Sequence, residues 1–177
     1  SMAEDNMNRV IRHWRQEKRS NANLNSRYNE VPADFLEIIR FGIISDNTSP
    51  IEMISQSDML DRRSRSANTA GLPQFYALTA GEIELFPTPA EAYATELYYY
   101  GKIDALSDTN TSNWLLQNHQ DAYLYGSLIH SAPYFVDDAR LQMWVALHQS
   151  AIDAINVESD AVKSGGSGRR IIIRGLS

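Results

Sequence analysis

The hydrophobic pattern of this chain changes its period near Gly101, and the change limits the folds that the sequence can adopt. Residues 73–100 carry short apolar and β-branched runs separated by Pro and Gly, which is typical of strands. Residues 138–156 instead carry apolar side chains at helical spacing. These side chains are Leu141, Trp144, Val145, His148, Ile152 and Ile155. Strand and helix patterns in separate segments indicate an α+β fold.

Within the strand-like region, Ala80 and Gly81 separate two short apolar runs and predict a β-hairpin. The second run alternates polar and apolar residues, so Glu82 and Glu84 are expected on a solvated face. The expected strands are residues 36–44, 51–54, 73–78, 82–86 and 92–100, with a short helix over 57–63 capped by Ser57. We therefore expect a small antiparallel β domain in the middle of the chain.

Helical periodicity marks both sides of this β domain. Residues 4–19 predict a helix with a narrow apolar stripe, and residues 119–135 predict a helix that is apolar nearly all round and therefore buried. The expected architecture is a small α-helical bundle with an inserted antiparallel β domain and an extended C-terminal tail. Its parts are the N-terminal helix of the bundle over 1–25, the β domain over 26–101, the C-terminal helices over 102–162, and a hinge with a docking tail over 163–177.

The C-terminal end combines a flexible linker with a short segment of high β propensity. Residues 164–168 are all Gly or Ser, and such linkers behave as flexible chains. The following residues are expected to add as a strand to a neighbouring sheet edge, or to fold back on the protein's own sheet. The partner-binding residues expected here are Arg169, Arg170, Ile171, Ile172, Ile173, Arg174 and Leu176.

Charge is unevenly distributed along the chain. The net charge is −6, but residues 1–28 carry +3, residues 163–177 carry +4 and the segment between them carries −13. Basic ends on an acidic body favour contacts between copies, or contacts of the ends with another acidic partner. The predicted first helix places three arginines opposite its apolar stripe as candidate inter-subunit contacts. They are Arg12, Arg15 and Arg19.

No motif for catalysis, metal binding or a cofactor stands out, so we expect a protein that is not an enzyme. The chain lacks cysteine and its four histidines are scattered. His119 and His130 are eleven residues apart and could share a helix face, but neither has a carboxylate three or four residues later to complete a metal site. No Gly-rich phosphate loop or nucleophile elbow occurs. Glu82 and Glu84 could serve as the paired catalytic carboxylates of a glycosidase, but alternating acids on a strand face are normally only solvated. No apolar run approaches the ~18 residues of a bilayer span.

A cluster of tyrosines leaves a second interpretation open. Tyr93 and residues 98–100 could form an aromatic platform, which would make the chain a non-enzymatic module that binds a peptide or single-stranded nucleic acid. The alternative is that alternate tyrosines pack into the core. The acidic character of the β domain disfavours nucleic acid, because phosphates would be repelled.

A series of short motifs resembles the SU10-type family of tailed-phage head-to-tail adaptors, found in podovirus-like and prophage genomes. Residues 31–36 (V-P-A-D-F-L) are similar to the family's L-P-x-D-F-L, and 73–77 with 81–89 are similar to its hairpin P-x-x-Y-A … G-x-I-x-L-x-P-x-P. The remaining motifs follow in the same order at residues 97–100, 106–108, 113–116, 123–128, 132–134 and 137–138, with Trp144 in the last helix. Together they cover residues 4–176.

The resemblance implies a structural virion protein that forms a ring beneath the portal protein. Such a ring is dodecameric, extends the DNA channel without binding DNA specifically, and docks the tail nozzle or fibres. The C-terminal tail would bind the portal or a neighbouring subunit, after assembly in the host cytoplasm. The family's further helical stretch before the segment that matches residues 2–20 is missing, which predicts a truncated chain or a shorter member. No membrane and no cofactor are implied.

Overall fold

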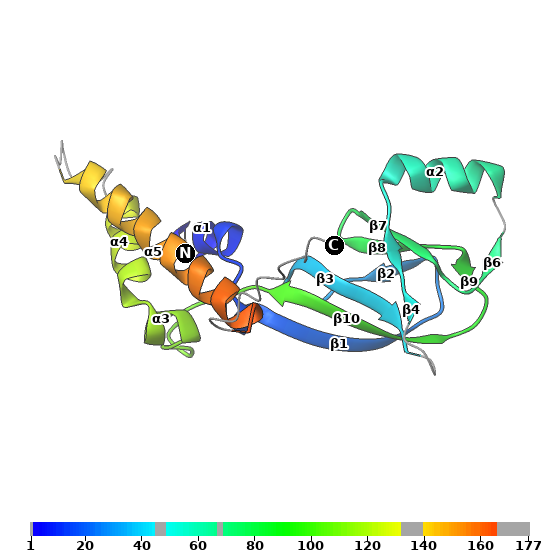
Figure 1. Ribbon diagram of the computed structural model, residues 1–177, viewed down its shortest axis with the longest axis horizontal. Helices are drawn as coiled ribbons and strands as arrows, with labels where there is room; N and C mark the ends of the chain where they lie inside the picture. The colour runs from blue at the N-terminus through cyan, green and yellow to red at the C-terminus, as the bar shows by residue number, and fades with distance from the viewer. Residues whose placement is uncertain (1, 45–48, 67–68, 132–139, 166–177) are drawn as a thin grey trace, which may run out of the picture. The chain divides into compact units, whose positions relative to one another are not determined.

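The computed structural model describes residues 2–44, 49–66, 69–131 and 140–165 (Figure 1). The chain has an α+β fold, as predicted, and divides into two compact units. One unit is formed by Ser1–Gln16 together with Lys102–Ser177, and we call it the helical unit. The other is Glu17–Gly101, which we call the β unit.

The β unit is built mainly from two four-stranded sheets. Their orders are β1-β10-β3-β4 and β2-β8-β7-β5, and β6 pairs with β9 beside them. The pairing is antiparallel except in the short pairs β5–β7 and β6–β9. The elements are β1 (Glu17–Leu24), β2 (Tyr28–Glu30), β3 (Phe35–Ile43), β4 (Ser49–Pro50), β5 (Glu52–Met53), α2 (Gln56–Arg65), β6 (Ala70–Gly71), β7 (Phe75–Thr79), β8 (Glu82–Phe86), β9 (Thr88–Pro89) and β10 (Tyr93–Gly101).

The predicted hairpin between β7 and β8 is confirmed. Ala80 and Gly81 both have positive φ, at 52° and 85°, as a two-residue turn between twisted strands requires. Side chains from both sheets form one core, in which Phe41 meets Tyr76 edge to face at 5.4 Å between ring centroids. The helix α2 packs beside β7 and begins after Ser55, whose side chain accepts from the Asp58 amide, so the expected cap at Ser57 was wrong.

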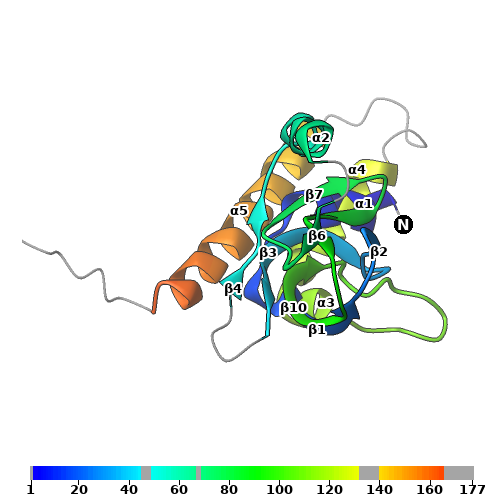
Figure 2. The same ribbon diagram turned by 90° about the vertical axis from the view of Figure 1, so that its right-hand side faces the viewer.

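The helical unit has its own hydrophobic core. The helices α4 and α5 lie side by side in Figure 1, and α1 packs against α4. Figure 2 shows α5 along its length. Met7 of α1, Leu115 of α3 and Ile155 of α5 are fully buried in this core. The elements are α1 (Met2–Val10), a 3-10 turn η1 (Trp14–Gln16), α3 (Trp114–Asn118), α4 (Gln120–Ser131) and α5 (Leu141–Lys163). None of the described helices combines the length and apolar character that a membrane span needs.

The expected helix over residues 4–19 is wrong in its second half. The helix α1 ends at Val10, and Glu17–Leu24 forms strand β1 instead. Every residue of β1 pairs with β10, from Glu17 opposite Tyr100 to Leu24 opposite Tyr93. This pairing outweighs the weak helical periodicity, since helix propensity is only a weak prior that tertiary contacts override.

Candidate functional site

The buried carboxylate of Glu84 occupies the centre of the β unit. Its Oε1 accepts from Arg27 Nη2 at 2.6 Å and Arg63 Nε at 2.8 Å, and its Oε2 accepts from Gln56 Nε2 at 3.1 Å. Burial favours a higher pKa, but the hydrogen bonds from Gln56, Arg63 and Arg27 outweigh it, so the pKa of Glu84 lies below its ordinary value. The expectation of a solvated Glu84 was therefore wrong.

This arrangement suits a structural centre rather than a catalytic acid. Glu84 is 0% exposed, and the arginines on Oε1 come from the segment before β2 and from α2. A carboxylate enclosed by its own ion pairs cannot reach a substrate. The pair Glu82 and Glu84 therefore lacks the accessible geometry that glycoside hydrolysis requires.

The tyrosines of β10 divide between the two faces of their sheet. Tyr99 is buried, and its hydroxyl donates to Asp34 Oδ1 at 3.0 Å, while Tyr98 and Tyr100 are half-buried on the opposite face. Burial and the Asp34 carboxylate raise the pKa of Tyr99 to about 12. Tyr99 is thus a core residue and is not available to stack on a base.

The three candidate arginines of the N-terminal segment lie in different environments. Arg12 donates through Nη1 to the carbonyls of Asn8 and Ile11 at the end of α1. Arg15 lies over the ring of Trp14, while Arg19 belongs to β1 and pairs with Glu96 at 3.3 Å. They do not share one helix face, because the segment turns from helix to strand between them.

The expected docking tail lies outside the described residues. This applies to Arg169, Arg170, Ile171, Ile172, Ile173, Arg174 and Leu176, and also to the expected helix cap at Asp137 or Asp138. Their roles stay predictions.

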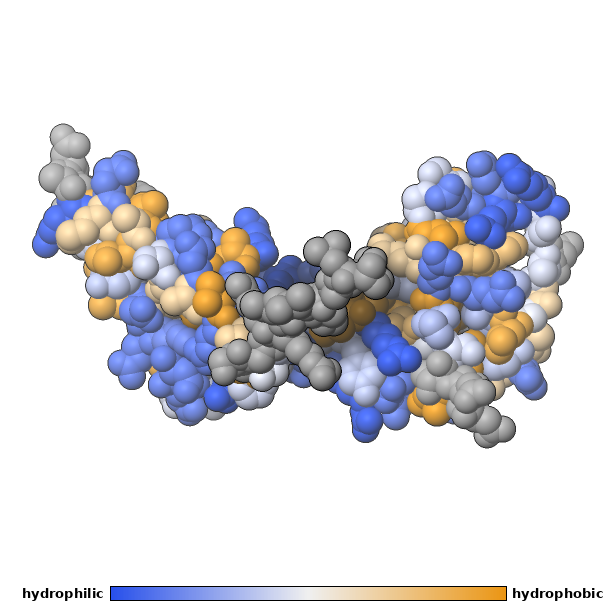
Figure 3. Space-filling view, in the orientation of Figure 1, coloured by the Kyte–Doolittle hydropathy of each residue, from blue (hydrophilic) through white to orange (hydrophobic). Residues whose placement is uncertain are grey.

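The helix α5 carries a second apolar face besides the one it buries in the core. Met143, Leu147, Ala154 and Val157 lie at i, i+4, i+11 and i+14, which are seam positions of a coiled-coil repeat, and the polar Ser150 occupies the seam position i+7 between them. Met143 is 51% exposed and Val157 is 67% exposed. Hydrophobic side chains are visible on the surface of this helix in Figure 3. We call Met143, Leu147, Ala154 and Val157 the α5 stripe.

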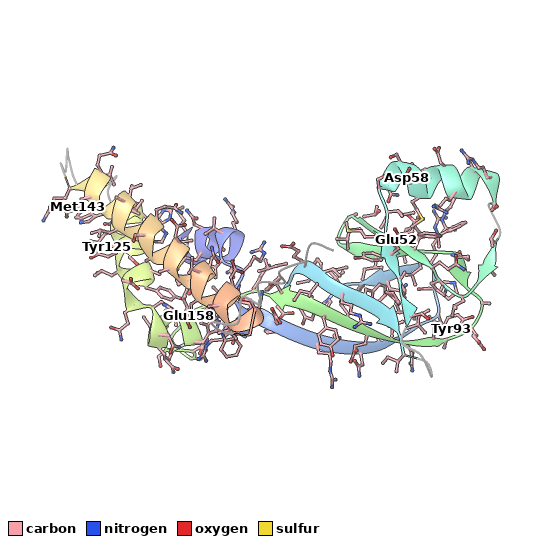
Figure 4. All side chains as sticks on the ribbon, in the orientation of Figure 1. Glu52, Asp58, Tyr93, Tyr125, Met143 and Glu158 are labelled. Atoms are coloured by element: carbon pink, nitrogen blue, oxygen red, sulfur yellow. The ribbon has the colours of Figure 1, made fainter. Side chains whose placement is uncertain are left out.

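Two histidines and a glutamate come together elsewhere in the helical unit. His13 Nε2 lies 3.7 Å from Glu158 Oε1, and His119 Nε2 lies 3.6 Å from Glu158 Oε2. His13 precedes η1, His119 follows α3, and Glu158 lies near the end of α5, where Figure 4 labels it. The histidine spacing in the sequence did not indicate this cluster, because the carboxylate comes from a distant helix.

Aromatic rings enclose the imidazole of His13. The ring stacks on Trp114 with 4.8 Å between centroids, and Trp14 and His119 lie within 5.6 and 6.2 Å. Burial lowers the pKa of His13 below its ordinary value, and His119 and Arg15 act in the same direction against Glu158. The imidazole of His13 is therefore held in its neutral form near pH 7.

An exposed apolar helix face is typical of a surface that binds another protein. The family model described as SU10 adaptor protein matches residues 1–170 of this chain. The chain therefore belongs to the SU10 adaptor family, as the motifs predicted. The comparison with curated proteins found no match. Family membership supports a structural adaptor role in the phage virion, where the chain interacts with other head and tail components.

Proposed function

We propose that this protein forms the adaptor ring beneath the portal, and that the α5 stripe is part of the contact between neighbouring subunits. In this ring the helical units contact one another side by side, and the stripe covers part of a neighbouring subunit. The observation that carries the proposal is the exposure of apolar side chains at coiled-coil spacing along one face of α5. Soluble proteins seldom leave such a face uncovered unless it binds a partner.

The charge distribution supports contacts between unlike ends of neighbouring molecules. The chain carries +4 in residues 163–177 and −13 in residues 29–162, so the tail of one subunit is attracted to the body of another or to acidic portal residues. The net negative charge also suits a channel that lets DNA pass without holding it. We infer a dodecameric ring that extends the channel and docks the tail nozzle or fibres, after assembly in the host cytoplasm.

In this proposal, the C-terminal tail provides the attachment to the portal or to a neighbouring subunit. Arg169, Arg170 and Arg174 pair with acidic groups, while residues 171–173 add a strand to a sheet edge of the partner. Leu176 adds an apolar contact at the end of the segment. The tail becomes ordered on docking, so the entropic cost of ordering it falls on assembly.

The direct test mixes the protein with the portal protein of the same phage and images the product by electron microscopy. We expect a ring stacked on the portal, and we expect a chain that lacks residues 164–177 to keep the same melting temperature but fail to attach. Failure of the intact chain to bind a well-assembled portal would contradict the proposal. Loss of stability on deletion would show that the tail packs within its own chain.

A further inference from the structure

His13 contains a buried polar atom that lacks a hydrogen-bond partner. The side chain of His13 is 0% exposed, and its Nε2 has no partner within hydrogen-bond distance among the described residues. The Glu158 carboxylate lies on the same side at 3.7 Å, which is too long for a hydrogen bond. Buried polar atoms are rarely left unsatisfied, because each one costs free energy. Some group should therefore be expected between His13 and Glu158.

The atoms around this position are those that a transition metal prefers. One ligand atom each from His13, His119 and Glu158 lie within 4.8 Å of one another. Imidazole nitrogen and carboxylate oxygen both bind Zn²⁺ at about 2.0–2.2 Å, so the ligands of one tetrahedral ion lie roughly 3.3 Å apart. The two nitrogen–oxygen distances, 3.7 Å from His13 to Oε1 and 3.6 Å from His119 to Oε2, are slightly longer and run to different oxygens of Glu158, so one carboxylate faces both imidazoles.

We propose that His13, His119 and Glu158 bind a divalent transition-metal ion, for which Zn²⁺ is the appropriate probe. Two histidines and one carboxylate make a donor set that suits Zn²⁺ and leaves a fourth position for water. The Glu158 side chain is 50% exposed, so it can move the few tenths of an ångström that closer coordination requires. This site is independent of ring formation, since all three ligands belong to one subunit.

Metal binding requires one specific rearrangement at His13. Its Nδ1 accepts from the Arg15 amide at 3.2 Å, which places the proton of the neutral ring on Nε2. Coordination uses the Nε2 lone pair, so the ring stays neutral only if its proton moves to Nδ1. The Arg15 amide must then give up this acceptor. The rearrangement opposes binding, and it also provides a spectroscopic signature.

The ion would join three segments of the helical unit that are far apart in the sequence. His13 lies between α1 and η1, His119 follows α3, and Glu158 lies on α5. A ligand that binds only the folded state raises the melting temperature in proportion to the logarithm of its concentration. The structural role expected for this metal is therefore to stabilise the helical unit.

The test titrates the untagged, metal-free protein with zinc and follows binding by calorimetry and thermal unfolding. We expect one ion per chain and a melting temperature raised by roughly 5–10 °C at a hundredfold excess of free zinc over the dissociation constant. In ¹⁵N spectra of the side chains, zinc should shift Nε2 of His13 and of His119 and move the His13 proton to Nδ1.

Two variants separate the site from adventitious binding. Glu158→Gln and His119→Gln should each weaken zinc binding at least tenfold, because each removes one ligand. They are preferred to a His13 variant, because removing the imidazole that stacks on Trp114 would also destabilise the helical unit. Asp153→Asn removes an exposed acid from the same helix outside the cluster and should leave affinity unchanged. No zinc binding by the metal-free protein, or equal affinity in all three variants, would overturn the proposal.

Discussion

At the residue scale, Glu84 shows how burial and charge pairing determine a role that its sequence position does not reveal. The carboxylate lies on a strand that alternates polar and apolar residues, yet four residues of β8, including Glu84 itself, are buried. Two arginines approach it from other segments. The charge is stable there only because all of its partners are present.

Replacing Glu84 with Gln should destabilise the β unit by about 3 kcal/mol, because two arginines would lose their buried anion. Urea denaturation followed by circular dichroism measures this change. Glu82→Gln is the matched control, since Glu82 lies two residues earlier on the same strand and forms no ion pair with another residue of the described segments. An equal effect of both substitutions would show that the network does not stabilise the fold.

The same network predicts how stability depends on pH. The pKa of Glu84 is lower in the folded state than its ordinary value of 4.5, so its contribution is complete above pH 4.5 and is lost as the pH falls through the folded pKa. The unfolding free energy of the native chain should therefore fall more steeply below pH 4.5 than that of Glu84→Gln. Parallel curves for the two proteins would contradict this assignment.

At the scale of the element, α5 has two faces with different partners. One face places Trp144, Ile152 and Ile155 in the core, as the periodicity predicted, while the α5 stripe is exposed on another part of the helix surface. A single helix can stabilise its own unit and present a binding surface, because side chains at different helical angles serve different neighbours.

Val157→Asp should prevent ring formation and leave the monomer as stable as the native chain, since Val157 is 67% exposed. A charge at a seam position would be desolvated on assembly without a partner. Mass photometry in the presence of the portal protein measures the assembled fraction. Val145→Asp makes the same change on the same helix outside the stripe, where the side chain is 45% exposed. Rings formed equally by both variants would show that the stripe is not an interface.

The short helix α3 depends on the cap that Asn113 forms just before its first residue. Asn113 is almost fully buried, and its Oδ1 accepts from the Leu116 amide while its Nδ2 donates to the Asp104 carbonyl and to the Tyr123 hydroxyl. Asn113→Ala should lower the melting temperature by several degrees, for a loss of about 1–2 kcal/mol. Asn118→Ala, at the exposed other end of α3, should cost less than half as much. Thermal unfolding of the two variants distinguishes these outcomes.

At the scale of the whole molecule, each of the two units has its own hydrophobic core. The first and last strands of the β unit pair from Glu17 opposite Tyr100 to Leu24 opposite Tyr93, so the two ends of the unit are neighbours in one sheet. A segment with its own core and adjacent ends has what an autonomous domain requires.

Residues 17–101 should therefore fold when produced alone. We expect dispersed amide signals and a cooperative unfolding transition that Glu84→Gln shifts to lower denaturant concentration. The matched comparison is residues 26–101, which lack β1 and leave one edge of β10 unpaired, and which should be markedly less stable. An unfolded 17–101 fragment would show that the β unit depends on the rest of the chain.

Local sequence patterns were sufficient to predict the α+β class, the hairpin at Ala80 and Gly81, the long strands β3 and β10, and the buried face of α5. These features depend on hydrophobic spacing and turn residues, which involve only residues that are close together in the sequence. Three features became known only from the three-dimensional fold: residues 17–24 form a strand, Glu84 is buried, and His13 and His119 lie close to Glu158. Each of these features depends on contacts with residues that are distant in the sequence, and local hydrophobic patterns cannot identify such contacts.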